Sequence, residues 1–184
     1  MIKMKKFAML LFLASTSLFF SCSSDDDAPT EVDQNLIPGE WNLTEVKSEN
    51  GKVSATIQNI PVSGDFTLTG KDYTAKATFT ETSATDEPNT FVSSGGFTAV
   101  ATISIPTQDP IEYEEPIPDF IGTGEWKTEG NILTTTVAGE EESFEIVSLT
   151  AETMTLKITI NEDIERQGIT FAVTGDQIFT LTKN

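Results

Sequence analysis

The chain has 184 residues, with 29 acidic and 11 basic side chains, no histidine and one cysteine. Without histidine, it has no Ser-His-Asp or Cys-His nucleophile system and no histidine-ligated metal site. One cysteine allows no internal disulfide, and a net charge of −18 opposes binding to nucleic acid. We therefore expect a protein that is not an enzyme, with no catalytic residues and no nucleic-acid partner.

Residues 1–21 have the composition of a targeting segment rather than of a folded element. The segment begins with three lysines and continues with an unbroken apolar run at residues 7–14. This run is too short for a membrane-spanning helix, which needs about 20 apolar residues. The single cysteine, Cys22, stands where the apolar stretch ends. A signal peptide cleaved near Ser21 that leaves an ordinary free thiol is the plain alternative.

With Ser21 as the small residue before Cys22, the segment resembles a bacterial lipoprotein signal, although Phe19 and Phe20 stand where the commonest pattern has leucine and a small residue. The resemblance implies that Cys22 becomes the N-terminus and carries a thioether-linked diacylglycerol and an N-acyl chain. Two or more chains suffice to hold a protein on a membrane, because each buried methylene contributes about 0.8 kcal/mol. We expect no other cofactor.

The residues after the cysteine are Ser23, Ser24, Asp25, Asp26 and Asp27. This run resembles the export signal of surface-displayed lipoproteins of the Bacteroidota type, and a solvated acidic spacer is the alternative. The resemblance implies a lipid-anchored protein of the outer membrane, displayed on the cell surface, with the periplasmic face as the alternative.

Residues 22–36 are polar and include Pro29, which predicts a flexible acidic tether. From residue 37 to residue 184 we expect one all-β domain, because apolar and polar residues alternate with period two and no comparable window has helical spacing. Thr, Val, Ile and Phe fill most of these positions. The runs predict strands, some of which merge, at about 40–48, 53–59, 64–69, 72–80, 95–105, 121–128, 131–138, 142–148, 153–161, 167–174 and 177–183.

Turn signals between these runs predict antiparallel hairpins in sequence order, hence a meander. The meander is expected to close into a barrel, because closure removes exposed sheet edges; a β-sandwich is the alternative. Residues 81–89 are predicted to form a long loop. Residues 106–118 are predicted to form an acidic, proline-rich excursion rather than a central strand. The predicted turns lie at Asn50-Gly51, 70–72, 129–131, 139–142 and Gly175-Asp176.

Gly39-Glu40-Trp41 opens the first strand, and Gly124-Glu125-Trp126 repeats the pattern later. Over residues 37–48 and 122–183 the chain resembles lipocalins and the lipocalin-like domains of bacterial lipoproteins. The resemblance implies a barrel closed at one end by Trp41, with a cavity for a small apolar ligand. In lipocalins a basic side chain late in the chain stacks over the first tryptophan, and the candidates here are Arg166 and Lys183. Trp41 and Trp126 are candidate ligand contacts, and their alternative role is to anchor the core.

Three oxygen-rich runs are candidate calcium sites: Asp25 to Asp27, Glu140 to Glu142 and Asn161 to Asp163. None has the alternating spacing of a calcium loop, so we expect solvated turns or tether and no metal site. The sequence thus predicts a lipid-anchored, lipocalin-like, non-catalytic binding module for a small apolar ligand. The alternative is a structural, interaction or carbohydrate-binding domain with Tyr113 and the proline-rich loop at its rim. Protein partners are not indicated.

Overall fold

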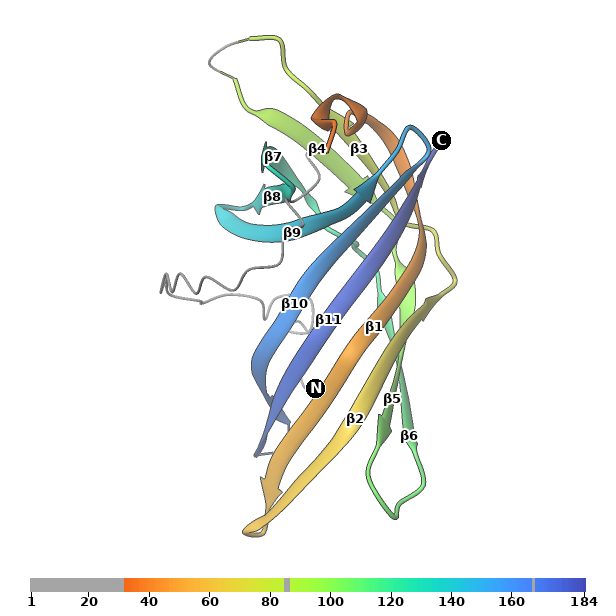
Figure 1. The fold of residues 1–184 in the computed structure, drawn as a ribbon, viewed down its shortest axis with the longest axis vertical. Helices are drawn as coiled ribbons and strands as arrows, with labels where there is room; N and C mark the ends of the chain where they lie inside the picture. Colours follow the sequence, from red (N-terminus) through yellow and green to blue (C-terminus); the bar gives the residue numbers. More distant parts are fainter. Residues whose placement is uncertain (1–31, 85–86, 167) are drawn as a thin grey trace, which may run out of the picture.

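The computed structural model describes residues 32–84, 87–166 and 168–184. The predicted signal peptide, Cys22 and the run from Ser23 to Asp27 lie outside these residues. The described chain begins with a short 3₁₀ helix, η1 (Gln34–Leu36), and continues as strands (Figure 1). The strands are β1 (Gly39–Ile57), β2 (Ile60–Lys71), β3 (Lys76–Thr80), β4 (Asn89–Ser94), β5 (Phe97–Ser104), β6 (Ile111–Ile117), β7 (Thr123–Glu129), β8 (Ile132–Val137), β9 (Glu140–Leu149), β10 (Thr153–Arg166) and β11 (Ile169–Lys183).

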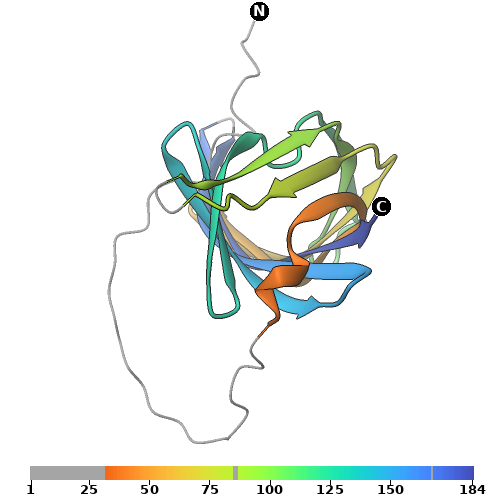
Figure 2. The same cartoon turned by 90° about the horizontal axis from the view of Figure 1, so that it is seen from above.

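All strands belong to one antiparallel sheet with the order β11-β10-β9-β8-β7-β4-β3-β1-β2-β5-β6. A further pairing between β11 and β1 closes eight of them, β1, β3, β4 and β7 to β11, into a ring. Figure 2 shows this ring from above, with η1 beside its upper end. The predicted antiparallel barrel is therefore confirmed, and the chain does not form a sandwich of two sheets.

The ring is closed only in its upper half, because β2 and β3, β4 and β5, and β6 and β7 are pairs of half-strands separated by breaks. Above the breaks, β3, β4 and β7 complete the ring; below them, β2, β5 and β6 extend the sheet beside β1 (Figure 1). Each break contains a left-handed residue: Asp72 (φ 55°), Gly95 (φ 69°) and Gly122 (φ 74°). At Gly95 a Cβ would lie 2.3 Å from the carbonyl oxygen of Thr74, so only glycine fits there.

Two bulges make β1 longer than predicted. The first, between Leu43 and Glu45, turns Val46 into the core, although simple alternation places it on the opposite face. The second lies at Asn50-Gly51, where a turn was predicted. The prediction of turns here and at Gly175-Asp176 is wrong, because the two glycines face each other across the ladder. A Cβ on Gly175 would lie 2.9 Å from the Cα of Gly51.

The turn that does end β1 is formed by Gln58 and Asn59, both with positive φ (50° and 66°), as a two-residue hairpin requires. A second correction concerns residues 106–118, where residues 111–117 form β6 instead of an excursion. β6 is the last strand in the sheet order and therefore an edge strand. Pro116 is tolerated there because an edge strand leaves one side of its backbone unpaired.

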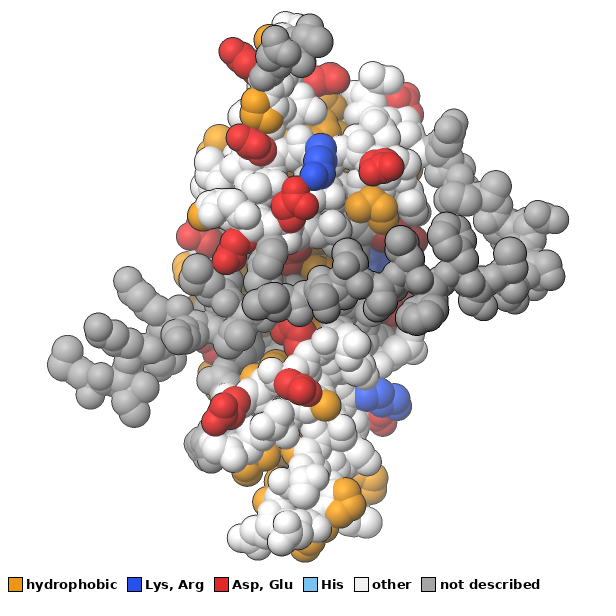
Figure 3. All heavy atoms as spheres, turned by 90° about the vertical axis from the view of Figure 1, so that its left-hand side faces the viewer, with side chains coloured by type: hydrophobic (Ala, Val, Ile, Leu, Met, Phe, Trp, Pro, Cys, Tyr) orange, Lys and Arg blue, Asp and Glu red, His pale blue; other side chains and the backbone are white. Residues whose placement is uncertain are grey.

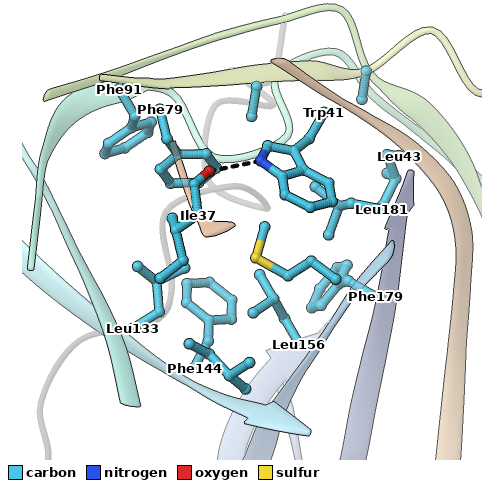
Figure 4. Close-up of a cluster of buried hydrophobic side chains, with 14 of the residues drawn as sticks. Ile37, Trp41, Leu43, Phe79, Phe91, Leu133, Phe144, Leu156, Phe179 and Leu181 are labelled. Carbon is cyan, nitrogen blue, oxygen red and sulfur yellow. Dashed lines mark hydrogen bonds between the residues drawn. The ribbon is translucent and has the colours of Figure 1, made fainter. Parts of the chain in front are cut away.

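The buried core fills the upper ring (Figure 4). Its largest fully buried side chains include Trp41, Phe79, Phe91, Leu133 and Met154. Phe79 stacks on Phe91 with ring centroids 5.8 Å apart and meets Trp126 edge-on at the same distance. In contrast, the lower sheet contributes mainly half-buried side chains. Within the described chain, no helix is long and apolar enough to cross a membrane.

Candidate functional site

Trp41 closes the upper end of the barrel. Its indole is completely buried, and Nε1 donates a hydrogen bond of 2.8 Å to the carbonyl oxygen of Ile37 (Figure 4). Ile37 directly follows η1 and is itself fully buried. The hydrogen bond therefore fastens the chain that enters the barrel to the first strand. A buried indole N–H needs such a partner, and here the backbone supplies it.

Lys183 is the cation that lies over Trp41. The two residues are direct partners in the β1–β11 ladder, and the lysine Nζ lies 4.9 Å from the centroid of the indole ring. The same ammonium donates a hydrogen bond of 2.9 Å to the carbonyl oxygen of Leu36. Arg166, the other candidate, ends β10 at the opposite end of that long hairpin. The choice that the sequence left open is thus decided by the closure of β11 on β1.

Trp126 is also part of the core. Its indole is 5% exposed, and Nε1 lies 3.2 Å from the carbonyl oxygen of Thr80 and 3.1 Å from that of Thr90. Both tryptophans use their N–H groups within the protein and lie in the filled upper ring. The structure therefore places both indoles in the core of the closed end, and their role as ligand contacts stays a prediction.

Below the core, the inward side of the sheet remains apolar but is only half-buried. Strand pairing and alternation place one set of side chains on this side, and none of its members belongs to the buried core cluster or to the residues packed against it. We call this set the lower inner face. Its members are Val53, Ala55, Val62, Phe66, Ala101, Ile103, Ile160, Ile164, Phe171 and Val173.

Exposed apolar side chains surround the tips of the lower strands. Ile57 and Ile60 flank the β1–β2 turn and are 37% and 63% exposed. Ile111 and Tyr113, on the edge strand β6, are also exposed. Figure 3 shows hydrophobic side chains gathered at this lower tip, whereas acidic side chains are spread over the rest of the visible face. Apolar side chains are thus exposed at the open end of the barrel.

Two carboxylates interrupt the apolar character of the interior. Glu142 has the same orientation on β9 as the buried residues Phe144 and Ile146, and Glu162 alternates with Ile160 and Ile164 on β10. Burial raises the pKa of both groups, and the negative charge of Glu162 raises the pKa of Glu142 further. Neither carboxylate was expected to face inward, because the two acidic runs were predicted to be solvated turns. Each carboxylate stands two positions from an apolar residue that faces inward, and this alternation could have predicted its orientation.

Two hollows of about 500 and 490 Å³ lie along the lower sheet, and Val53, Ala55 and Val62 of the lower inner face are among their lining residues. They share Ser54, Ser63 and Ala172, and hydroxyl and other small side chains form most of their walls. Their walls also carry the charged side chains Lys52, Asp65 and Asp163, so they match a small apolar ligand less well than the lower inner face does. Tyr113 is the one aromatic among the large exposed hydrophobic side chains of the described residues, and its hydroxyl donates a hydrogen bond of 2.5 Å to Glu115. This arrangement is not the flat aromatic face expected of a carbohydrate-binding domain.

A small antiparallel barrel, closed at one end by a stacked tryptophan and open at the other toward an apolar inner face, defines the class of β-barrel binding folds. The comparisons agree: the chain matches the family model of the lipocalin-like domain over residues 37–156, which is more than half of its length. The chain belongs to the lipocalin-like family. This fold is typically a non-catalytic binding domain. No curated protein matches the chain.

Within the described residues, no group of three or more acidic or cysteine side chains is placed to hold a metal ion.

Proposed function

We propose that this protein is a lipid-anchored binding module of the cell envelope that holds a small apolar ligand against the lower inner face. The observation that carries the proposal is the contrast within one barrel interior. The upper interior is filled by buried side chains, whereas the apolar side chains below it are only half-buried. A ligand that covered them would gain about 25 cal/mol for each Å² of apolar surface removed from water.

We expect the ligand to be apolar and uncharged, with at most a small polar group. Ten apolar residues form the lower inner face, and Glu142 and Glu162 are the inward carboxylates described near it. An anionic group on the ligand would be repelled by these carboxylates and by the net charge of the protein. Sugars and nucleotides are poor candidates, because the lower inner face offers few hydrogen-bonding side chains to orient them.

Binding can be tested with a chain that begins at residue 22 and carries Cys22→Ser, so that no acyl chain competes for the site. A neutral naphthylamine dye, which fluoresces in apolar surroundings, is titrated into the protein. We expect saturable binding that Phe171→Ser weakens at least about tenfold, because a lost aromatic contact of about 1.4 kcal/mol corresponds to that factor. Val147→Ser is the matched control, because Val147 is apolar but 52% exposed on β9. Equal affinity in all three proteins would reject the lower inner face as the site.

The proposed anchor is a diacylglycerol thioether on Cys22 together with an N-acyl chain. Its support is the sequence alone: a basic start, an apolar run, and a small residue before the only cysteine. Cys22→Ala should release the protein from membranes or leave it uncleaved. Mass spectrometry of the mature N-terminus is the direct measurement. An unmodified N-terminal peptide from the membrane-bound protein would contradict the anchor.

Display on the cell surface is proposed from the run Ser23 to Asp27, with retention on the periplasmic face as the alternative. Replacing Asp25, Asp26 and Asp27 with alanine should reduce digestion of the protein by protease added to intact cells. The lipid anchor should be unaffected, which mass spectrometry can verify on the same samples. Unchanged digestion would leave the acidic run as a spacer.

A further inference from the structure

The ladder between β9 and β10 stops partway down the barrel. Its last pair is Glu145 with Lys157, whose side chains form an ion pair on the outer surface. Below that pair, residues 140–144 of β9 pair only with β8, and residues 158–166 of β10 pair only with β11. Figure 1 shows β9 curving away from β10 in this region. We call the boundary between these two segments the β9–β10 seam.

Glu142 and Glu162 lie on the inward side of this seam, one on each strand. If the ladder continued in its last register, Glu142 would lie opposite Ile160 and diagonal to Glu162. Diagonal neighbours in an antiparallel pair are about 7–8 Å apart, and like charges at such positions oppose pairing. Burial adds to this cost, because a carboxylate loses water when it is enclosed by apolar side chains. The two groups therefore resist closure of the seam while they are ionised.

No described side chain of opposite charge faces the pair. The β8 partner of Glu142 is Thr135, and the β11 partner of Glu162 is Val173, both uncharged. The nearest ionisable neighbour on β9 with the same orientation is Glu140, which is acidic as well. Among the described side chains, Lys183 is held at the upper end. The remaining described lysines form ion pairs with acidic residues on the outer surface: Lys47, Lys52, Lys71, Lys76, Lys127 and Lys157.

We propose that Glu142 and Glu162 together form a pH-operated spacer in the β9–β10 seam. Ionised, they hold β9 and β10 apart at the open end of the barrel; protonated, they let the two strands approach. Protonation removes the repulsion between the two groups and the cost of burying charge, and a neutral carboxylic acid can donate a hydrogen bond across the seam. Acidification then narrows the opening and neutralises both inward carboxylates. The proposal concerns the protein without ligand and does not depend on what it binds.

The width of the seam can be measured between two nitroxide labels on its outer side. The protein is the chain from residue 22 with Cys22→Ser, Ser143→Cys and Asn161→Cys, which places one exposed label on each strand. Double electron–electron resonance gives the distance at about pH 8 and about pH 4. The lower pH lies below the ordinary glutamate pKa of about 4.3, so a group whose pKa is raised is protonated there. We expect the mean distance to shorten by a few ångströms at the lower pH. Tryptophan fluorescence verifies at both pH values that the closed end stays folded.

Two double variants decide whether the carboxylates cause the change. Glu142→Gln with Glu162→Gln keeps the shape of the side chains and removes both charges, so we expect the short distance at either pH. Glu125→Gln with Glu165→Gln is the matched control, because it removes two exposed carboxylates and should leave the pH response intact. An invariant distance in the parent protein, a control that loses the response, or an inward double variant that keeps the longer distance would overturn the proposal. Because no ligand is present, such a result would not touch the proposed binding function.

Discussion

The two halves of this barrel are built from half-strands that continue one another along the chain, and yet their side chains are buried to different degrees. In the upper half, β3, β4 and β7 close the ring around fully buried side chains such as Trp41 and Leu133. In the lower half, the same chain directions continue as β2, β5 and β6, but this sheet does not close and its inward side chains stay half-buried. The two halves differ in the closure of the ring rather than in hydrophobic content. The closed half buries its side chains and stabilises the fold, and the open half is the part that we propose to bind a ligand.

The largest expected effect comes from emptying the closed half. Trp41→Ala should lower the free energy of unfolding by about 3–5 kcal/mol, because it removes a fully buried aromatic side chain and leaves a cavity. Urea unfolding followed by far-UV circular dichroism measures the change. Phe171→Ala in the open half is the comparison variant, with an expected loss of about 1 kcal/mol, since a half-buried side chain loses less contact. Similar losses at both sites would mean that the side chains of the two halves contribute equally to the free energy of unfolding.

A smaller effect is expected at the junction of η1, β1 and β11. Lys183→Met keeps the aliphatic stem but removes the cation over Trp41 and the hydrogen bond to the carbonyl oxygen of Leu36. We expect a loss of about 1–2 kcal/mol in unfolding free energy. Lys183→Arg retains a cation and a donor and should recover most of the loss. If the methionine variant is as stable as the parent, the closed end does not depend on this cation.

Glu142→Gln should stabilise the protein at neutral pH by about 0.5–1 kcal/mol, because it removes a charge that is partly buried and is repelled by Glu162. The pKa of Glu142 is raised in the folded state, so the folded protein holds that proton more tightly than the unfolded chain does. The stability of the parent protein therefore declines as the pH rises from the ordinary glutamate pKa through the raised one. The difference between variant and parent should be smallest in acid and reach its full size above the raised pKa. Chemical unfolding across this pH range tests the sign, and a variant that is less stable than the parent at neutral pH would contradict it.

The smallest effect is expected on the outer surface. Lys127 and Glu141 form an ion pair of 2.7 Å, but their side chains are 65% and 55% exposed. A pair so accessible to water contributes about 0.5 kcal/mol or less, and salt screens it. Lys127→Gln should therefore leave the unfolding midpoint nearly unchanged at moderate ionic strength. A loss comparable to that of Lys183→Met would show that outer charges stabilise the ring more than its closed end does.

Local pattern was sufficient to predict the secondary structure and the barrel. Alternation of period two reports which side chains can share one buried face, and that property depends only on near neighbours in the chain. It identified runs such as Phe97 to Ile103 and Met154 to Ile160 without any knowledge of the fold. It failed where an extra residue shifted the alternation, as at Val46 and at Asn50-Gly51, because a bulge is specified by the partner strand as much as by the residues within it.

The sequence by itself therefore determined that the chain is all-β, acidic and arranged as an antiparallel meander, and it supplied the expectation of a lipid anchor at Cys22. Only the tertiary structure decided that Lys183 rather than Arg166 covers Trp41, that the tryptophans belong to the filled end, and that Glu142 and Glu162 face inward. These are relations between strands far apart in the chain, such as β1 and β11. Ring closure sets them, because it fixes which residues become neighbours and which side of each strand loses contact with water.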